Sequence, residues 1–255
     1  NFRLLEIFGK NTSSISVHIK FNTGMNRYGF NTDEIDLLVT KLKGFSHLKI
    51  ESICSHLAVA DDISRDIFTQ KQFEKFDIIC KTFSSKLNIN PKRHILNTAG
   101  FLRFPDWQYE MVRLGIGFYG VSKDDNLKAV GKLVSNIAQI RTLKKGEEVG
   151  YGASFIAKQE MKIAVIPLGY ADGINRKLGD GKGRVLIKNI SAIIIGKISM
   201  DSFMVDISGI NAKEGDLVTI FSEENSVDDI AKNLDTIPYE ILARSEEHTS
   251  ELQSQ

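Results

Sequence analysis

The sequence predicts an α/β part in residues 1–125, followed by a mainly β part in residues 126–243. In the first part, short apolar segments alternate with amphipathic ones, which is the pattern of a parallel sheet or barrel covered by helices. Around residues 122–126 the chain becomes polar, and the later apolar segments are short, β-branched and bounded by turn residues. With 255 residues, of which 42% are apolar and 25% charged, the chain is long enough for two such domains.

Composition argues against several classes of function. The 33 basic and 32 acidic residues leave a net charge of +1, so neither a nucleic acid nor a membrane surface is expected as a partner. No apolar run approaches the roughly 18 residues of a membrane span, and no signal peptide is expected. The two cysteines, Cys54 and Cys80, have no metal-ligand spacing, so no metal site is predicted and a reduced, cytoplasmic setting is expected.

Strands and helices alternate through the first part. Strands are expected at residues 16–21, 48–55 and 93–96. Residues 111–119 end this alternation of strands and helices. The helix after the first strand begins with Asn31 and Glu34 at the spacing of a capping box. The helix after the second strand carries an apolar stripe at three-to-four spacing, which is typical of core packing. The stripe consists of Phe73, Phe76, Cys80, Phe83 and Leu87.

Polar residues follow these segments where each ends. The carboxyl ends of parallel strands share one edge of a sheet or one mouth of a barrel, and chemistry is expected there. The candidates at these positions are Lys20, Arg27, His56, Thr98 and Arg113. A closed eight-unit barrel takes about 250 residues, so the first part is expected to hold about half of one and to expose strand edges.

The second part is dominated by strands. They are expected at residues 132–142, 161–166, 184–187, 192–198, 203–207 and 217–221. Only residues 226–234, which a serine N-cap opens, look helical in this part. Two tyrosines, Tyr151 and Tyr170, are flanked by glycines at expected strand borders, where a phenol could move a proton or bind an anion. On spacing alone, two half-buried aromatic residues with solvated hydroxyl groups are the more common arrangement.

Seven motifs, in this order along the chain, resemble those of the alanine racemases. They are residues 20–29 (KFNTGMNRYG), 55–58 (SHLA), 112–116 (VRLGI), 150–152 (GYG), 169–173 (GYADG), 199–201 (SMD) and 237–240 (IPYE). One such motif is a weak signal, whereas seven in family order are specific. The resemblance covers residues 2–242 and implies the C-terminal part of a TIM-like (β/α)8 barrel followed by a β domain. It also implies pyridoxal 5'-phosphate as cofactor, and interconversion of L-alanine and D-alanine that supplies peptidoglycan.

The resemblance assigns a role to each candidate. Two bases on opposite faces of the α-carbon exchange its proton, and Tyr151 matches the tyrosine that serves one face. His56 and Arg113 match the relay behind it, and Arg113 also matches the arginine beside the pyridine nitrogen. The implied phosphate ligands are Thr98, Gly115, Ile116 and Tyr239. The implied substrate-binding residues are Arg27, Met200 and Tyr170, and Lys20 matches a lysine that is often carbamylated.

Three departures from the family pattern qualify these expectations. Asn22 stands where aspartate is usual, which removes a charge near Lys20 and makes its carbamylation less certain. The family's Schiff-base lysine lies before Asn1, so this chain alone is expected to be inactive. Residues 244–255 do not resemble the family's closing segment and look like an artificial tail.

Alternatives remain open at the level of sequence. Racemases of serine, lysine or arginine share the implied fold. A non-catalytic pyridoxal-phosphate carrier with a single barrel is a further reading, although that class has no second β domain, and a decayed paralogue is a third. Because Tyr151 lies in the β part whereas His56, Thr98 and Arg113 lie in the barrel part, a homodimer with shared active sites is expected.

Overall fold

The computed structural model describes residues 1–11, 13–121 and 127–244. The chain divides into two compact units, Asn1–Phe118 and Tyr119–Gln255, and each is described by itself. The junction expected at residues 125 and 126 and nearly all of the expected tail lie outside the described residues.

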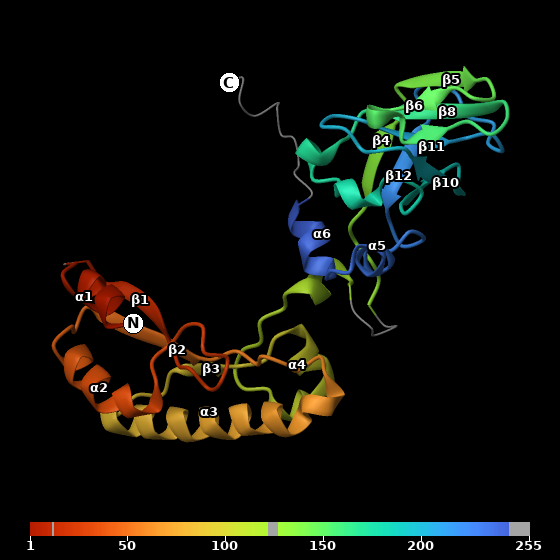
Figure 1. The fold of residues 1–255 in the computed structure, drawn as a ribbon. Helices are drawn as coiled ribbons and strands as arrows, with labels where there is room; N and C mark the ends of the chain where they lie inside the picture. The colour runs from red at the N-terminus through yellow and green to blue at the C-terminus, as the bar shows by residue number, and fades with distance from the viewer. Residues whose placement is uncertain (12, 122–126, 245–255) are drawn as a thin grey trace. The chain divides into compact units, whose positions relative to one another are not determined.

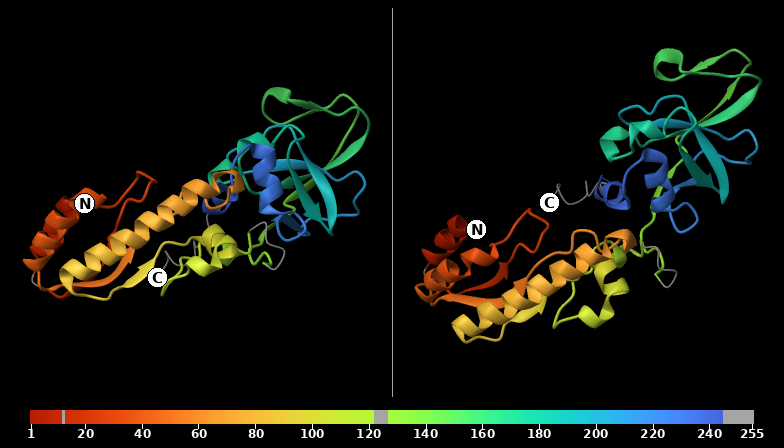
Figure 2. Two further views of the ribbon diagram at one scale, coloured as in Figure 1. Left: turned by 90° about the horizontal axis from the view of Figure 1, so that it is seen from below. Right: turned by 60° about the horizontal axis from the view of Figure 1, so that its bottom comes forward.

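The first unit is built on a three-stranded parallel sheet in the order β1-β2-β3. Its strands are β1 (Ile15–Lys20), β2 (Leu48–Cys54) and β3 (Lys92–His94), within two residues of the expected bounds. The helices α2 (Ile35–Lys43) and α3 (Asp66–Leu87) lie on one face of this sheet (Figures 1 and 2). Two shorter helices complete the unit, α1 (Phe2–Gly9) and α4 (Thr98–Arg103).

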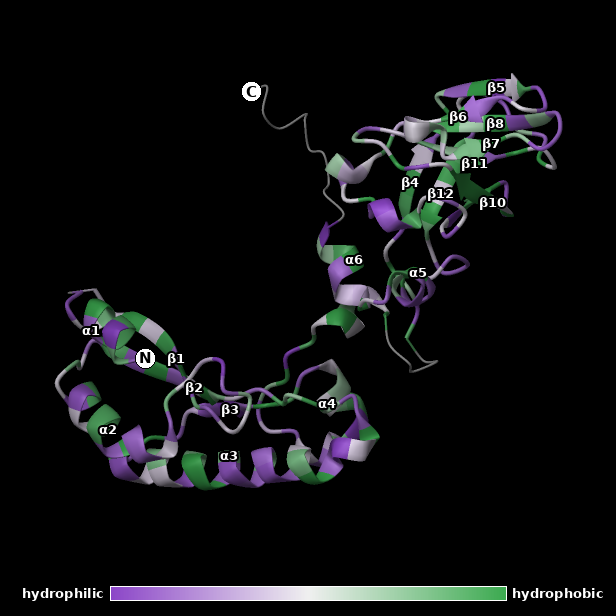
Figure 3. Cartoon of the chain, viewed as in Figure 1, coloured by the Kyte–Doolittle hydropathy of each residue, from purple (hydrophilic) through white to green (hydrophobic). Residues whose placement is uncertain are grey.

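The two faces of this sheet differ in character because side chains alternate along a strand. Ile19 and Ile53 belong to the buried cluster that includes Phe76 and Phe83 of α3. Figure 3 shows the corresponding alternation of hydrophobic and hydrophilic residues along α3. Their strand neighbours His18 and Ser52 therefore face the opposite side of the sheet. The sheet is apolar toward its helices and polar toward the other side.

The segment that ends the expected run, residues 111–119, is irregular. The segment at residues 111–119 forms no strand, although Met111 N–H donates to the Arg93 carbonyl (3.3 Å) and Arg113 N–H to the Leu96 carbonyl (3.0 Å). These two bonds hold the segment alongside β3. After Gly115 the chain turns into a 3-10 helix at Ile116–Tyr119. The unit thus has three regular strands and one irregular neighbour.

The second unit is a seven-stranded antiparallel sheet in the order β4-β12-β9-β10-β11-β8-β5. Its strands are β4 (Leu133–Asn136), β5 (Gln139–Leu143), β8 (Met161–Ile166), β9 (Arg184–Ile187), β10 (Ile190–Ile195), β11 (Phe203–Asp206) and β12 (Leu217–Phe221). A separate ribbon pairs β6 (Glu148–Val149) with β7 (Phe155–Ile156). Three strands, β8, β9 and β12, have the expected bounds.

The expected single run at residues 132–142 is wrong. It is divided into β4 and β5, which lie at opposite edges of the sheet and pair with β12 and β8. At the division, Ile137 N–H donates to the Asp216 carbonyl (3.0 Å) and Ala138 N–H to the Val165 carbonyl (2.9 Å). Buried Ile137 keeps the run apolar, so the change of partner strand leaves no mark in the hydropathy pattern.

The helix expected at residues 226–234 is confirmed as α5 (Val227–Leu234), with the Ser226 hydroxyl accepting from Asp229 N–H (3.1 Å). A second helix, α6 (Pro238–Arg244), contradicts the expectation of only one. It begins at a proline, which suits the first helical turn, and its Ile241 and Leu242 pack against the core of the sheet. Among the described residues, no helix is both long and apolar enough to cross a membrane.

Candidate active site

Arg113 is the centre of a polar cluster in the first unit. Its Nη2 donates to the Ser55 carbonyl (2.5 Å), the Ile95 carbonyl (3.3 Å) and His56 Nδ1 (3.1 Å). Its Nη1 donates to the His94 carbonyl (3.2 Å) and to His94 Nδ1. The guanidinium is therefore fixed between the ends of β2 and β3, with an imidazole on either side.

The two imidazoles are neutral acceptors. Burial, followed by the Arg113 charge, lowers the pKa of His56 to about 4, and the same two causes lower the pKa of His94 to about 4. Burial also lowers the pKa of Arg113, but a guanidinium remains charged and can only donate. Each Nδ1 must then be unprotonated, and each ring carries its proton on Nε2.

One donor of Arg113 is left over. Within residues 1–11, 13–121 and 127–244, the Nη1 and Nη2 atoms make all the hydrogen bonds of this side chain, and Nε–H makes none. A cationic donor of this kind suits an acceptor such as a ring nitrogen. It cannot protonate that acceptor, because a guanidinium does not give up its proton at ordinary pH.

Thr98 forms a second polar group at the start of α4. Its Oγ1 accepts from Gly115 N–H (3.0 Å) and Gly117 N–H (3.2 Å), and the residue is buried. A Cβ on Gly117 would lie 2.5 Å from Thr98 Cγ2, so only glycine fits there. Because Thr98 Oγ1 accepts from both N–H groups, the hydroxyl keeps its own proton for another acceptor, such as a phosphate oxygen. Ile116 lies between the two glycines.

Lys20 and Arg27 line one cavity of about 420 Å³, together with His18 and apolar residues of α1. Lys20 Nζ lies 5.9 Å and the Arg27 guanidinium carbon 5.8 Å from the centre of the Tyr28 ring. The structure thus brings these two predicted residues to one place. The amide of Asn22 holds the loop between them, since its Nδ2 donates to Asn26 Oδ1 (2.9 Å) and Asn31 Oδ1 (3.1 Å), which an aspartate could not do.

Gln72 of α3 was missed by sequence reasoning. Its side chain is buried, with Oε1 accepting from Ala58 N–H (2.9 Å) and Nε2 donating to the His56 carbonyl (3.1 Å) and Thr23 Oγ1 (3.3 Å). It therefore joins the loops that follow β1 and β2 and fixes the backbone of His56. On the sequence it is one polar residue in a helix, which gives no signal of this role.

The predicted residues of the second unit are exposed. The exposed fractions are 73% for Tyr151, 50% for Tyr170, 57% for Met200 and 51% for Tyr239. Tyr151 opens a 3-10 turn directly after β6, between Gly150 (φ +73°) and Gly152 (φ +69°), and Tyr170 opens another after β8. The expectation that both tyrosines lie at strand borders is therefore confirmed.

Tyr170 and Met200 lie in adjacent loops. Tyr170 N–H donates to the Ser199 carbonyl (3.0 Å), and Ala171 N–H donates to the Met200 carbonyl (3.0 Å). Gly169 permits this approach, because a Cβ there would lie 2.1 Å from the Met200 oxygen. Tyr239 lies elsewhere in the unit, on α6.

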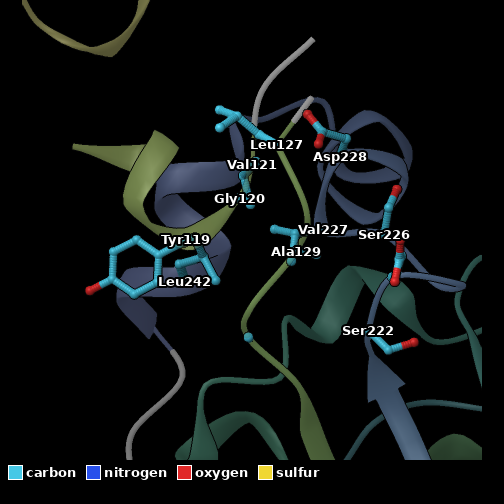
Figure 4. Close-up of a pocket in the computed structure, with 12 residues that line it drawn as sticks. Tyr119, Gly120, Val121, Leu127, Ala129, Ser222, Ser226, Val227, Asp228 and Leu242 are labelled. Carbon is cyan, nitrogen blue, oxygen red and sulfur yellow. The ribbon is translucent and has the colours of Figure 1, made fainter. Parts of the chain in front are cut away.

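A small cavity in the second unit does not belong to the predicted site. It has a volume of about 160 Å³ and is bordered by Leu127, Ser226 and Val227 among others (Figure 4). None of the predicted site residues lines it. The candidate groups of the first unit are therefore the Arg113 and Thr98 clusters and the cavity at Lys20 and Arg27, and those of the second unit are its exposed loops.

Comparisons with known proteins identify a family for both parts of the chain. Family models for the N-terminal and the C-terminal domain of alanine racemase match residues 3–123 and 130–252. An alanine racemase of Nostoc sp. is 37% identical over 243 residues, which cover 90% of this chain and 62% of that protein. An amino-acid racemase of Enterococcus faecalis is 34% identical over 262 residues, which cover 96% of this chain and 36% of that protein.

Solved structures show the same relationship. The crystal structure of alanine racemase from Bartonella henselae with covalently bound pyridoxal phosphate has a TM-score of 0.81 and 30% identity, over 96% of this chain and 68% of that one. The chain spans 62–64% of the length of three curated alanine racemases that it matches. Its fold is the C-terminal part of a β/α barrel followed by a mainly β domain. The chain therefore belongs to the alanine racemase family.

Proposed function

We propose that the full-length protein interconverts L-alanine and D-alanine with pyridoxal phosphate as its cofactor. The observation that carries the proposal is Arg113, a half-buried donor-only group with two neutral imidazoles on Nη1 and Nη2, whose Nε–H makes no hydrogen bond among the described residues. An amino-acid racemase among the relatives supports a second candidate, the racemisation of serine, lysine or arginine.

The donor groups of the first unit fit this cofactor. A phosphate dianion needs several converging hydrogen-bond donors, and the Thr98 hydroxyl proton and the Ile116 N–H are proposed as two of them. The Gly115 N–H, which donates to Thr98 Oγ1 in this structure, is proposed as a third that would change partner when phosphate binds. Tyr239 is the fourth proposed phosphate ligand. A pyridine nitrogen needs a donor, and the Nε–H of Arg113 is that donor. Bound pyridoxal phosphate supplies an electron sink for the electron pair that deprotonation of the α-carbon leaves behind.

Arg113 restrains this electron sink. The guanidinium would donate a hydrogen bond to the ring nitrogen of the cofactor without transferring its proton, so Arg113 would leave that nitrogen unprotonated and limit the delocalisation of charge away from the α-carbon. A proton then returns to the α-carbon in preference to other positions, which favours racemisation over transamination. The second imidazole, on His94, helps to keep the guanidinium in this orientation.

Tyr151 is the proposed base on one face of the α-carbon. A phenol with a pKa near 10 is a weak base at neutral pH unless its ionised form is stabilised. The Nε2–H of His56 is the proposed donor to that oxygen, because its Nδ1 is occupied by Arg113. Arg27 and the N–H of Met200 bind the substrate carboxylate, Tyr170 borders the entrance, and a carbamate on Lys20 orients Arg27.

The protein is proposed to act in the cytoplasm, where its product serves peptidoglycan synthesis. Its active site is proposed to be shared between the two subunits of a head-to-tail homodimer. The exposure of Tyr151, Tyr170 and Met200 supports this, since residues that act on a substrate must be covered when the site closes. We further propose residues 1–125 as the barrel domain and 126–243 as the β domain. The tail expected at residues 244–255 overlaps the match of the C-terminal family model, which extends to residue 252.

The test mixes two inactive variants of the full-length protein. One is Tyr151→Phe, and the other lacks the lysine that anchors the cofactor in the family. If sites are shared, random exchange makes about half of the dimers mixed, each with one working site, so activity approaches about a quarter of wild type. As a control, Arg113→Ala mixed with the lysine variant should restore nothing, because both changes lie in the barrel domain.

The outcomes separate the parts of the proposal. Background activity in both mixtures, with subunit exchange verified, would mean that Tyr151 serves its own subunit. Comparing kcat/KM of the wild-type protein for alanine, serine, lysine and arginine decides between the two candidate functions. An unmixed wild-type protein that racemises none of the four would overturn the proposed function.

A further inference from the structure

A hydrogen-bonded chain continues from Arg113 away from the proposed cofactor site. It passes through three residues on three neighbouring strands, His94 of β3, Ser52 of β2 and His18 of β1. Ser52 Oγ lies 2.9 Å from His94 Nε2 and 2.5 Å from His18 Nδ1. The strand register pairs His18 directly with Ser52. None of the three belongs to the motifs that predicted the site.

Burial differs along this chain. Ser52 is 0% and His94 4% exposed, whereas His18 is exposed and borders the cavity that Lys20 and Arg27 also line. The two inner members cannot exchange their partners for water, so each hydrogen bond must be satisfied within the protein. His18 lies at the accessible end.

The direction of every bond in the chain follows from Arg113. Because Arg113 only donates, His94 Nδ1 accepts and His94 carries its proton on Nε2. That Nε2–H donates to Ser52 Oγ, and the Ser52 hydroxyl then donates its own proton to His18 Nδ1. The chain therefore runs in one sense from Arg113 to His18. Arginine cannot pass a proton on, so this is no proton relay, and its effect is to fix a tautomer.

The Ser52 hydroxyl is the second support of this tautomer, beside Arg113. His18 Nδ1 and His94 Nε2 are 3.4 Å apart, which is long for a direct hydrogen bond. Without Oγ, the buried Nε2–H of His94 would lose its good acceptor. The other tautomer would then compete, and its Nδ1–H would point at the Arg113 guanidinium, donor against donor. One of the groups that hold Arg113 would be lost.

We propose that Ser52 is a positioning residue: it holds His94 in the Nε2–H tautomer and thereby keeps Arg113 directed at the proposed cofactor site. The role of Arg113 toward the cofactor rests on the proposed function, whereas the tautomer of His94 does not. The two are tested separately.

The first test observes the tautomer in the chain itself. Imidazole 15N chemical shifts of His94 at pH 7.5 should show the Nε2–H form alone in the unchanged protein. Ser52→Ala should give a mixture in which the Nδ1–H form exceeds roughly a third, while Ser52→Thr, which keeps the hydroxyl, should restore the single form. Ser16→Ala removes an exposed hydroxyl from β1 and should change nothing.

A variant at the accessible end protects the test against a folding defect. His18→Phe takes the acceptor away from the Ser52 hydroxyl, which then competes for His94 Nε2 and should also raise the Nδ1–H form. Because His18 is exposed, this variant should fold even where Ser52→Ala does not. A pure Nε2–H form of His94 in either variant overturns the proposal.

The second test uses the full-length holoenzyme. Ser52→Ala should lower kcat for racemisation about 10-fold and leave KM for alanine within about twofold, since the carboxylate-binding residues are untouched. Ser52→Thr should recover most of kcat. An altered tautomer with unchanged kcat would overturn the link from Ser52 to Arg113. A wild-type enzyme without racemase activity would instead overturn the proposed function and leave the tautomer result standing.

Discussion

The two units hold their proposed site residues in opposite ways. In the first, Arg113 and Thr98 are fixed by hydrogen bonds to buried backbone and side-chain groups. In the second, Tyr151 and Met200 are more than half exposed on loops after strands. Both units have an apolar core, but the site residues of the first lie in a polar cluster beside its core, whereas those of the second lie on exposed loops. We expect that replacing a polar site residue lowers the free energy of unfolding in the first unit. In the second unit, such a replacement should change only activity.

The largest effect is expected for Arg113→Met. The change leaves the carbonyls of Ser55, Ile95 and His94 without this donor and should lower the free energy of unfolding of the first unit by about 3–5 kcal/mol. Urea unfolding followed by Trp107 fluorescence measures this. Trp107 is the only tryptophan of the chain and stacks on Phe73 and Phe104, 4.5 and 4.3 Å between ring centres, so it reports on this unit.

Lys197→Met is the matched control in the second unit, because it likewise replaces a half-buried cation by methionine. Hydrogen exchange of the β8 and β11 amides should stay the same in both variants, because the two units have separate hydrophobic clusters. Loss of protection in β8 on replacing Arg113 would contradict the independence of the units.

A smaller effect is expected for Gln72→Leu. The leucine fills the space but leaves Ala58 N–H and the His56 carbonyl without partners in a buried place, which should cost about 2–3 kcal/mol. Gln70→Leu on the same helix is the control, since Gln70 is exposed and bonds only to Glu74 (2.8 Å). It should change the free energy of unfolding by less than about 0.5 kcal/mol. Equal effects at both positions would argue against the role of Gln72.

Acid should weaken the first unit in a defined pH window. His56 and His94 have pKa values of about 4 in the fold, below the usual 6.5, so the unfolded chain binds more protons between these values. Their contribution to stability is complete above pH 6.5 and is lost as the pH falls toward 4. The Tm seen by Trp107 should drop by about 5 °C from pH 7 to pH 5.

Carboxylates affect stability at lower pH than the histidines do, so the two contributions can be separated. Arg93 lowers the pKa of Glu110 to about 2, so that carboxylate loses its contribution only below its usual pKa of 4.5. His94→Gln should make the drop between pH 7 and pH 5 smaller by roughly half. An unchanged drop in this variant would show that other groups cause it.

The sequence predicted a feature where its signal lies within one short segment, and missed it where the feature depends on partners that are distant along the chain. β8, β9 and β12 were predicted because their apolar residues and turn signals lie within the segments themselves. Arg113 and Thr98 were identified by motif. Gln72 and Ser52 were not, because a buried polar residue looks like a surface residue until its distant partners are known. The division of residues 132–142 depends on β12 and β8, which lie far along the chain.

The smallest effect on stability is expected for Tyr151→Phe. The side chain is 73% exposed, so loss of the hydroxyl should change the free energy of unfolding by less than about 0.5 kcal/mol. In the full-length enzyme the same change removes the proposed base and should lower kcat by about 10²-fold or more. Tyr28→Phe, which changes an equally exposed tyrosine of the first unit outside the proposed catalytic groups, should leave the unfolding energy similarly unaltered. If Tyr151→Phe instead destabilised the chain by more than about 1 kcal/mol, the hydroxyl would have a structural partner, and the contrast between a fixed first unit and an exposed second one would fail at its most important residue.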